Sequence, residues 1–207
     1  DIEFGYKHKT KKAMWSLNLF YMNYKNQLVL TGEVNDVGAY NRTNVPISFR
    51  QGVEVEFALH ILKNLQLNLN ATLSKNRVRE FKEFIDDYDS TAQRVIKYDG
   101  SDIAFSPRTI MGSTIMYEPI KHLQISFITK YVSEQFLDNT SNPDRKLDAF
   151  LVNDLRINYT WKLKNGAEIG YILQVNNLFN EEYESNGYTY GYIYGGIHTV
   201  ENFYYPQ

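Results

Sequence analysis

The residue types that carry out most enzyme chemistry are present but scattered. The four histidines show neither an HExxH pattern nor a paired-ligand spacing, so we expect surface or lumen side chains at His8, His60, His122 and His198. No Gly-rich phosphate loop, GxSxG elbow or Ser/His/Asp spacing is present. The sequence contains no cysteine, which excludes thiolate metal sites, thiol nucleophiles and disulfides. These observations predict that the protein is not an enzyme.

Acidic residues form two groups that could act on a cation or a proton. Asp86, Asp87 and Asp89 could hold Ca²⁺ through oxygen ligands, but the surrounding sequence lacks the Gly and the distal Glu of an EF-hand loop. A solvated loop is the simpler interpretation. Glu54 and Glu56 share one face of an extended strand, and on the lumen face of a barrel they need no catalytic role. We therefore predict neither a metal site nor a cofactor.

Tyrosine is the informative excess, because 17 Tyr, 12 Phe and 2 Trp make up 15% of the chain. Amphipathic rings favour the headgroup level at both ends of a membrane-spanning segment, and a carbohydrate-binding sheet would also be rich in tyrosine. The Tyr/Gly-rich run near residue 190 has two open interpretations. It is either a mobile external loop that presents rings to a ligand or an extended strand whose same-parity tyrosines pack together. The candidate ligand-binding residues are Tyr40, Tyr188, Tyr190, Tyr192 and Tyr194.

The clearest strand that could support such side chains follows a tight turn at Asn165 and Gly166. Over residues 167–175 the side chains alternate between two faces, and Ile172 is the exception. The apolar face carries Ala167, Ile169, Tyr171, Leu173 and Val175, and the polar face carries Glu168, Gly170, Gln174 and Asn176. This alternation is typical of a membrane barrel strand, although a half-buried sheet of a soluble protein would show the same pattern.

Seven further segments are predicted to be strands. They cover residues 2–9, 14–30, 53–60, 65–74, 109–117, 123–133 and 150–161. The strand over 65–74 places five amide or hydroxyl side chains on one face, which suits a wet lumen better than an open surface. The mean hydropathy is −0.45, and no apolar run approaches the ~18 to 20 residues of a spanning helix. Because a barrel strand exposes only alternate side chains to lipid, this value does not exclude a membrane protein.

The lengths of the predicted connections alternate strictly. Short turns are expected near residues 11, 63, 120 and 164. Longer connections are expected at 31–47, at 79–108, at 136–148 and from 180 onward, with no successor strand before residue 207. Outer-membrane barrels have short periplasmic turns and longer external loops, whereas soluble sandwiches and propellers have no reason to keep this asymmetry. The sequence thus predicts an all-β fold, an antiparallel up-and-down transmembrane β-barrel represented by about eight strands.

Several motifs along the chain share features with a known family. The strand over 167–175 runs into NNLFN followed by Tyr183, and a Tyr/Gly-rich segment then ends in ENFYYPQ. Upstream are GVEVEF at 52–57 and, within 130–159, KYVSEQFLDNTSN and RKLDAFLVNDLRINY. Together these motifs spread over most of the chain and resemble the C-terminal region of TonB-dependent outer-membrane receptors.

The resemblance implies a barrel of about 22 strands with an N-terminal plug domain in its lumen. It also implies active uptake of a scarce ligand, with an iron chelate favoured, across the outer membrane of a Gram-negative bacterium. Residues 1–207 would be the C-terminal portion of that barrel, and the plug domain and last strand would be absent. The implied partners are the TonB complex, through an absent N-terminal segment, the receptor's own plug domain, outer-membrane lipid and a small ligand.

Two other functions remain open from the residues alone. Eight strands are enough to close a small barrel, which would act in adhesion or as a structural protein. A soluble glycan-binding β-sheet protein would also account for the tyrosines. Nucleic acid is not an expected partner, because a net charge of −2 gives no broad electrostatic attraction. The length and composition predict a single domain. The start at Asp1, without Met or a signal peptide, favours a mature or excised fragment.

Overall fold

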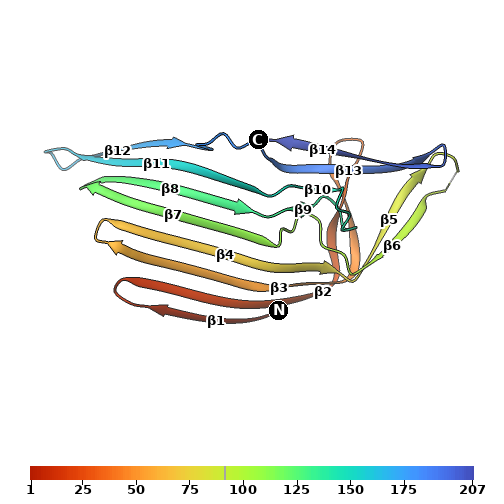
Figure 1. Ribbon diagram of the computed structural model, residues 1–207, viewed down its shortest axis with the longest axis horizontal. Coiled ribbons are helices and arrows are strands. Elements are labelled where there is room, and N and C mark those ends of the chain that lie inside the picture. The colour runs from red at the N-terminus through yellow and green to blue at the C-terminus, as the bar shows by residue number, and fades with distance from the viewer. Residues whose placement is uncertain (91) are drawn as a thin grey trace.

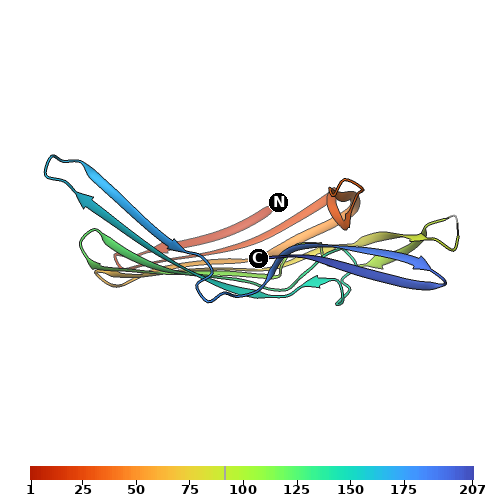
Figure 2. The same cartoon turned by 90° about the horizontal axis from the view of Figure 1, so that it is seen from above.

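The computed structural model describes residues 1–90 and 92–207, and its largest element is an eight-stranded antiparallel sheet (Figure 1). In sheet order the strands are β1 (Ile2–Lys9), β2 (Ala13–Val34), β3 (Tyr40–Leu62), β4 (Leu65–Val78), β7 (Thr109–Ile120), β8 (Leu123–Val132), β11 (Phe150–Lys162) and β12 (Glu168–Val175). The sheet is curved rather than flat (Figure 2). This arrangement confirms the predicted all-β, antiparallel, up-and-down fold.

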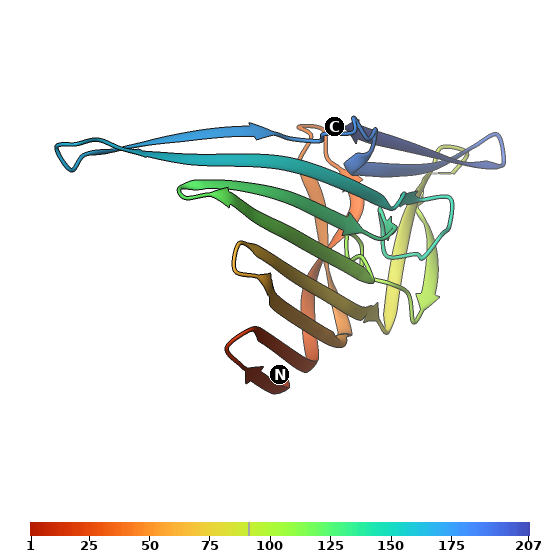
Figure 3. The same cartoon turned by 60° about the vertical axis from the view of Figure 1, so that its left-hand side comes forward.

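A second sheet lies at one end of the first. It has the order β14-β13-β5-β6 and contains β5 (Glu80–Asp87), β6 (Arg94–Asp99), β13 (Glu184–Tyr194) and β14 (Ile197–Pro206). A small hairpin of β9 (Gln135–Phe136) and β10 (Lys146–Leu147) belongs to the same end. Figure 3 shows the β5–β6 and β13–β14 hairpins at this end. We call this end of the main sheet the loop end, and the opposite end, which carries the turns at 10–12, 63–64, 121–122 and 163–167, the short-turn end.

The two faces of the main sheet differ in polarity. Strand pairing aligns one apolar row across six strands, Leu17, Val55, Ala71, Met111, Tyr131 and Leu151. The neighbouring row on the opposite face is mostly polar and contains Ser16, Glu56, Asn70, Gly112, Lys130 and Val152. Because side chains alternate with period two, this register keeps the two faces separate across the whole sheet.

The apolar face has a limited height. On β4 it extends from Leu65 to Leu73, about 26 Å along the strand, and the next side chains on that face are Lys75 and Arg77. Leu69 in the middle of this band is 40% exposed, and Met111 on the next strand is 43% exposed. Such a continuous exposed apolar band indicates a surrounding apolar medium and not water.

The polar face is held by contacts between neighbouring strands. Ser16 donates a hydrogen bond to Glu56 (3.1 Å), and Asn18 donates one to Glu54 (3.2 Å). These contacts give both glutamates polar partners on the predicted lumen face. The ring of Phe20 lies against Gly52, where a Cβ atom would come within 2.7 Å of the ring and 2.4 Å of a backbone carbonyl.

The prediction of a long loop at 31–47 was wrong. β2 extends to Val34 and β3 starts at Tyr40, so the connection is the short turn at 35–39. Of the residues that suggested a loop, Thr43 and Asn44 pair with β2, whereas Asn35 and Gly38 lie in the turn, and the register shifts between Leu30 and Val34. Polar residues pair in such extensions because the ladder uses backbone groups, whatever the side chain.

Two other predicted loops also contain strands. The segment 79–108 was predicted to be a loop, but β5 and β6 form a hairpin within it. Residue 91 of this segment lies outside the described residues. The segment after residue 180 was predicted to have no successor strand, and this was wrong because β13 and β14 form a ten-pair hairpin there. The connection predicted at 136–148 is confirmed as irregular apart from the short β9 and β10 strands at its ends.

The buried core lies at the loop end. Val29, Val45, Val78, Phe81 and Ile103 form a buried cluster, and Tyr98 packs against it. In the middle of the main sheet the structure is a single layer, so the described residues have no second layer to bury its apolar face. In the part of the chain that the structure describes, no helix is long and apolar enough to cross a membrane.

Candidate ligand-binding surface at the loop end

β13 divides its side chains between a buried side and an outer side. Gly187, Thr189, Gly191 and Ile193 are buried. Tyr188, Tyr190, Tyr192 and Tyr194 alternate with them and therefore share the other side of the strand. The structure thus brings four of the five predicted residues into one row, and the extended-strand interpretation of this segment is the one it adopts.

The tyrosine row packs with aromatic residues of both neighbouring strands. The rings of Tyr188 and Phe203 on β14 are stacked, with centroids 4.8 Å apart. Tyr88, which follows β5, places its hydroxyl 3.0 Å from that of Tyr190 and its ring 6.1 Å from that of Tyr192. The hydrogen bond with Tyr88, and then burial, raise the pKa of Tyr190, so the Tyr190 phenol stays a neutral hydrogen-bonding group at physiological pH. Tyr194 is 69% exposed near the end of the hairpin.

Tyr40 lies apart from this row. Its hydroxyl is 2.9 Å from Oδ1 of Asn186 and 3.0 Å from the carbonyl oxygen of Gly187, so it donates across to the start of β13. Its ring meets that of Phe105 edge-on, with centroids 5.9 Å apart. Burial raises the pKa of Tyr40. These contacts join β3 to β13, and they leave Tyr40 half-buried instead of fully presented to solvent.

The acidic cluster at the C-terminal end of β5 holds the tip of the β13–β14 hairpin. The Asp89 carboxylate accepts hydrogen bonds from the backbone amides of Gly195 (2.8 Å) and Gly196 (2.6 Å). Both glycines have positive φ, which the tight turn requires. Asp86 and Asp87 pair in parallel with Tyr192 and Ile193 of β13. Within residues 1–90 and 92–207, no group of three acidic or histidine side chains is arranged to hold a metal ion.

A buried ion network lies beneath β13. The Arg145 guanidinium contacts Glu83 of β5 at 2.5 Å and Asp138 of the β9–β10 loop at 2.7 Å, and all three side chains are almost fully buried. Burial acts to lower the pKa of Arg145, but hydrogen bonds and charge from Asp138 and Glu83 outweigh it and raise the pKa. Tyr98 donates to Glu83 (2.7 Å), and burial together with this carboxylate raises the Tyr98 pKa.

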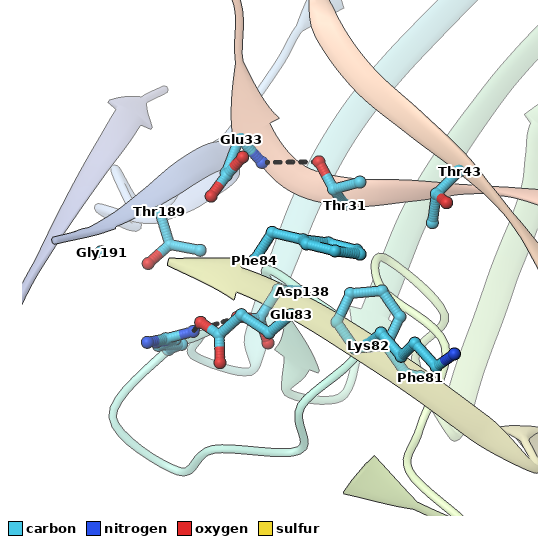
Figure 4. Close-up of a pocket in the computed structure, with 11 residues that line it drawn as sticks. Thr31, Glu33, Thr43, Phe81, Lys82, Glu83, Phe84, Asp138, Thr189 and Gly191 are labelled. Atoms are coloured by element: carbon cyan, nitrogen blue, oxygen red, sulfur yellow. Dashed lines mark hydrogen bonds and ion pairs between the residues drawn. The ribbon is translucent and has the colours of Figure 1, made fainter. Parts of the chain in front are cut away.

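A small cavity of about 60 Å³ adjoins this network (Figure 4). Its wall includes Glu33 from β2, Glu83 from β5 and Thr189 from β13. Burial raises the pKa of Glu33, and the charges of Asp86 and Glu83 raise it further. A cavity of this volume is of the size of a few water molecules, so it is too small for a chelate-sized ligand.

Sequence reasoning missed Tyr88, Glu83 and Arg145. The composition of 79–108 predicts a loop, yet Phe81, Glu83 and Ile85 alternate with residues outside the core, and this alternation is a signal for β5. Arg145 carried no such signal, because its partners Glu83 and Asp138 lie 62 and 7 positions away. Such pairing follows from the tertiary fold and not from local spacing.

The family comparison agrees with this architecture. The sequence model described as "TonB dependent receptor-like, beta-barrel" matches residues 1–178. This chain belongs to the TonB-dependent receptor family. The family consists of receptors and transporters, not enzymes, that lie in the Gram-negative outer membrane. A search of curated proteins finds no match.

Solved receptor structures share the fold of this TonB-dependent receptor chain. The ferric yersiniabactin uptake receptor FyuA from Yersinia pestis matches with a TM-score of 0.59 and 15% identity over 97% of this chain and 27% of that one. The ferric-catecholate import receptor Fiu from E. coli matches with a TM-score of 0.61 and 18% identity, over 99% of this chain and 25% of that one. The siderophore receptor PiuA from Acinetobacter baumannii matches with a TM-score of 0.61 and 14% identity, over 98% of this chain and 26% of that one.

These matches establish the fold. The chain spans about a quarter of the length of the receptors that it matches, and it is therefore a fragment of such a barrel. The family match ends at residue 178, within the segment that links β12 to β13. The tyrosine row of β13 lies beyond it.

Proposed function

We propose that this chain forms part of the barrel wall and the ligand-selecting outer surface of a TonB-dependent receptor that imports an iron chelate. The observation that carries the proposal is the family match over residues 1–178, on a sheet with one apolar and one polar face. The solved structures with the same fold are receptors for ferric yersiniabactin, ferric catecholates and other siderophores. Their ligands make an iron chelate the first class of compound to test.

The orientation in the outer membrane follows from the two ends of the main sheet. Outer-membrane barrels keep short turns on the periplasmic side and long loops outside. The loop end, with β5, β6, β13 and β14, is then extracellular, and the short-turn end is periplasmic. The apolar face contacts lipid, and the face with Glu54 and Glu56 lines the lumen.

The proposed ligand contacts are the tyrosines of the loop end, Tyr188, Tyr190, Tyr192 and Tyr194, with Tyr40 supporting the start of β13. Aromatic rings with hydroxyl groups offer large contact areas and hydrogen bonds to a chelate at low conformational cost. Tyr88 joins this surface through its contacts with Tyr190 and Tyr192.

The remaining parts of the receptor are proposed from the family. Residues 1–207 would be the C-terminal portion of the barrel, with the plug domain and the last strand outside this segment. The TonB complex would act through an N-terminal segment of the receptor, also outside it, and the plug would occupy the lumen. The edges of the sheet, β1 and β12, would pair with further strands of the same barrel.

The arrangement of the strands favours a receptor arc over a closed small barrel. β1 and β12 form the two edges of the eight-stranded sheet in the described residues, whereas a self-contained barrel would pair them. The apolar band on the outer face also argues against a soluble glycan-binding protein, since such a band would be exposed to water.

Uptake of labelled ferric chelates by cells that express the complete receptor tests the proposal. We expect a panel that includes ferric catecholates to contain a compound whose uptake requires the receptor and stops when the proton gradient is collapsed. A control strain without TonB should show surface binding but no uptake. Uptake that is unaffected by loss of TonB would contradict the proposed mechanism.

A further inference from the structure

The short-turn end concentrates positive charge. The segments 8–13, 60–65, 118–123 and 161–168 contain seven lysines and three histidines but only two acidic residues, Glu118 and Glu168. The remainder of the chain is net acidic, since the total charge is −2. The charge of this sheet is therefore strongly asymmetric along its strands.

Most of these lysines are free to meet a partner. Lys162 pairs with Glu168 at 2.6 Å. Among the ion pairs of the described residues, none involves Lys11, Lys12, Lys63 or Lys121. These four side chains are exposed and lie in three successive short turns, so they form one row along the rim of the sheet. We call this row the lysine rim.

A band of aromatic rings lies next to the lysine rim on the apolar face. It contains Tyr6, Trp15, Tyr117, Tyr159, Trp161 and Tyr171, all of them exposed. Tyr6 and Trp15 have ring centroids 5.1 Å apart, and Tyr159 and Tyr171 have centroids 6.4 Å apart. Exposed Trp and Tyr rings at the end of an apolar band mark the headgroup level of a bilayer. The rim lies directly beyond this level, where phosphate groups would be.

We propose that the lysine rim binds the headgroups of anionic phospholipids, such as phosphatidylglycerol, in the periplasmic leaflet. The proposal rests on the membrane orientation given under the proposed function. Lysine ammonium groups a few ångströms from an anionic surface attract it, and the attraction is additive along a row and decreases with salt. The contacts hold this end of the barrel at a defined depth while the loop end faces outward.

The two tryptophans allow a direct measurement at the rim. The chain has only Trp15 and Trp161, and both lie in the aromatic band. The complete receptor is reconstituted in phosphatidylcholine vesicles that contain an equal fraction of acyl-brominated phosphatidylglycerol or acyl-brominated phosphatidylcholine. Subtracting the signal of a W15F/W161F receptor isolates the quenching at these two positions.

We expect the brominated anionic lipid to quench the fluorescence of Trp15 and Trp161 more than the brominated neutral lipid does. This difference in quenching should decrease as salt is added. The triple variant Lys11→Gln, Lys12→Gln and Lys63→Gln should lower the preference for anionic headgroups by roughly tenfold to a hundredfold. Replacement of the same three residues by arginine should preserve it. The matched control Lys25→Gln, Lys82→Gln and Lys97→Gln changes exposed lysines away from the rim and should leave it unchanged.

The outcomes separate this inference from the proposed function. Equal quenching by the two lipids, or an excess that survives the Lys11, Lys12 and Lys63 substitutions, would overturn the lipid proposal while leaving the membrane orientation intact. Absence of quenching by either brominated lipid would instead contradict the assignment of the apolar face to lipid, on which the proposed function relies. If soluble polyglutamate bound the rim but anionic lipid did not, the partner would be an acidic protein and the lipid proposal would be wrong.

Discussion

Arg145 neutralises two buried carboxylates of the loop end, Glu83 and Asp138. Substitution by methionine leaves Glu83 and Asp138 as unpaired buried carboxylates, at a cost of about 3 to 5 kcal/mol. We expect β5 and β13 to open and to become sensitive to protease, while the barrel keeps its heat-dependent mobility in gels. Arg94→Gln, an exposed change on β6, is the control. Equal protease resistance of the Arg145 variant and the wild type would rule out this role.

Glu33 should make the loop end sensitive to pH. Its pKa is raised in the folded protein by burial and by Asp86 and Glu83, so folding favours the protonated form. The folded state then binds more protons than the unfolded state, and stability decreases as pH rises from the ordinary Glu pKa through the raised one. Hydrogen exchange at β2 and β13, corrected for intrinsic rates, should show greater protection at mildly acidic than at neutral pH. Glu33→Gln should remove this difference, and a difference that persists would locate the titrating group elsewhere.

Tyr192 tests the proposed ligand surface. Its ring packs against those of Tyr88 and Tyr190, in the centre of the tyrosine row. Tyr192→Ala should weaken binding of the transported ferric chelate by about five- to tenfold, as is usual for a central aromatic contact. Isothermal titration with the purified receptor measures the affinity. Tyr159→Ala at the short-turn end is the matched control, and equal affinities for the two variants would place the ligand elsewhere.

At the scale of the elements, Gly52 sets the distance between β3 and β4. An added Cβ would meet the backbone carbonyl of Leu73 at 2.4 Å and the ring of Phe20 at 2.7 Å. Because the carbonyl cannot move aside as a side chain would, Gly52→Ala should destabilise the sheet by about 1 to 3 kcal/mol. Gly170→Ala on β12 is the control, since nothing lies within 4 Å of its Cβ position. The midpoint of heat unfolding in detergent should decrease only for the Gly52 variant.

The strands within the apolar band were predictable because alternation reports a difference between two environments. On β4, the leucines of one face and the amides of the other differ strongly, so the strand was found and its start at Leu65 was confirmed. Beyond the band both faces meet water or protein, and the alternation fades. β3 was therefore predicted to begin at Val53, whereas it begins at Tyr40.

The loop-end sheet illustrates a second limit of sequence reasoning. β13 alternates Gly and Thr with Tyr, and glycine looks like a loop residue until its neighbours are known. In the structure, a Cβ at Gly187 would meet the Phe203 carbonyl at 2.5 Å, and one at Gly191 would meet the His198 ring at 3.2 Å. Close packing against a backbone carbonyl therefore requires glycine at position 187, whereas a Cβ at position 191 would need the His198 side chain to shift slightly. The contacts with β5 and Arg145 join segments far apart in sequence, so no local sequence pattern predicts them.

At the scale of the whole molecule, the two unpaired edges of the main sheet determine whether this segment is stable in a membrane without further strands. β1 and β12 each have eight residues, and each leaves one side without a strand partner in the described part of the chain. In a lipid core each unpaired backbone group costs several kcal/mol, so an isolated arc is far from stable there. Further strands of a receptor barrel would satisfy both edges at once.

We therefore expect the 207-residue polypeptide alone to remain in a heat-insensitive, protease-sensitive form when refolded into detergent or vesicles. The complete receptor under the same conditions should run as a compact band that shifts on boiling, because its barrel has no edges. Circular dichroism would separate an unfolded chain from an aggregated sheet. A compact, heat-modifiable band near 24.2 kDa from the polypeptide alone would mean that β1 and β12 pair with each other, and the small-barrel interpretation would replace the receptor arc.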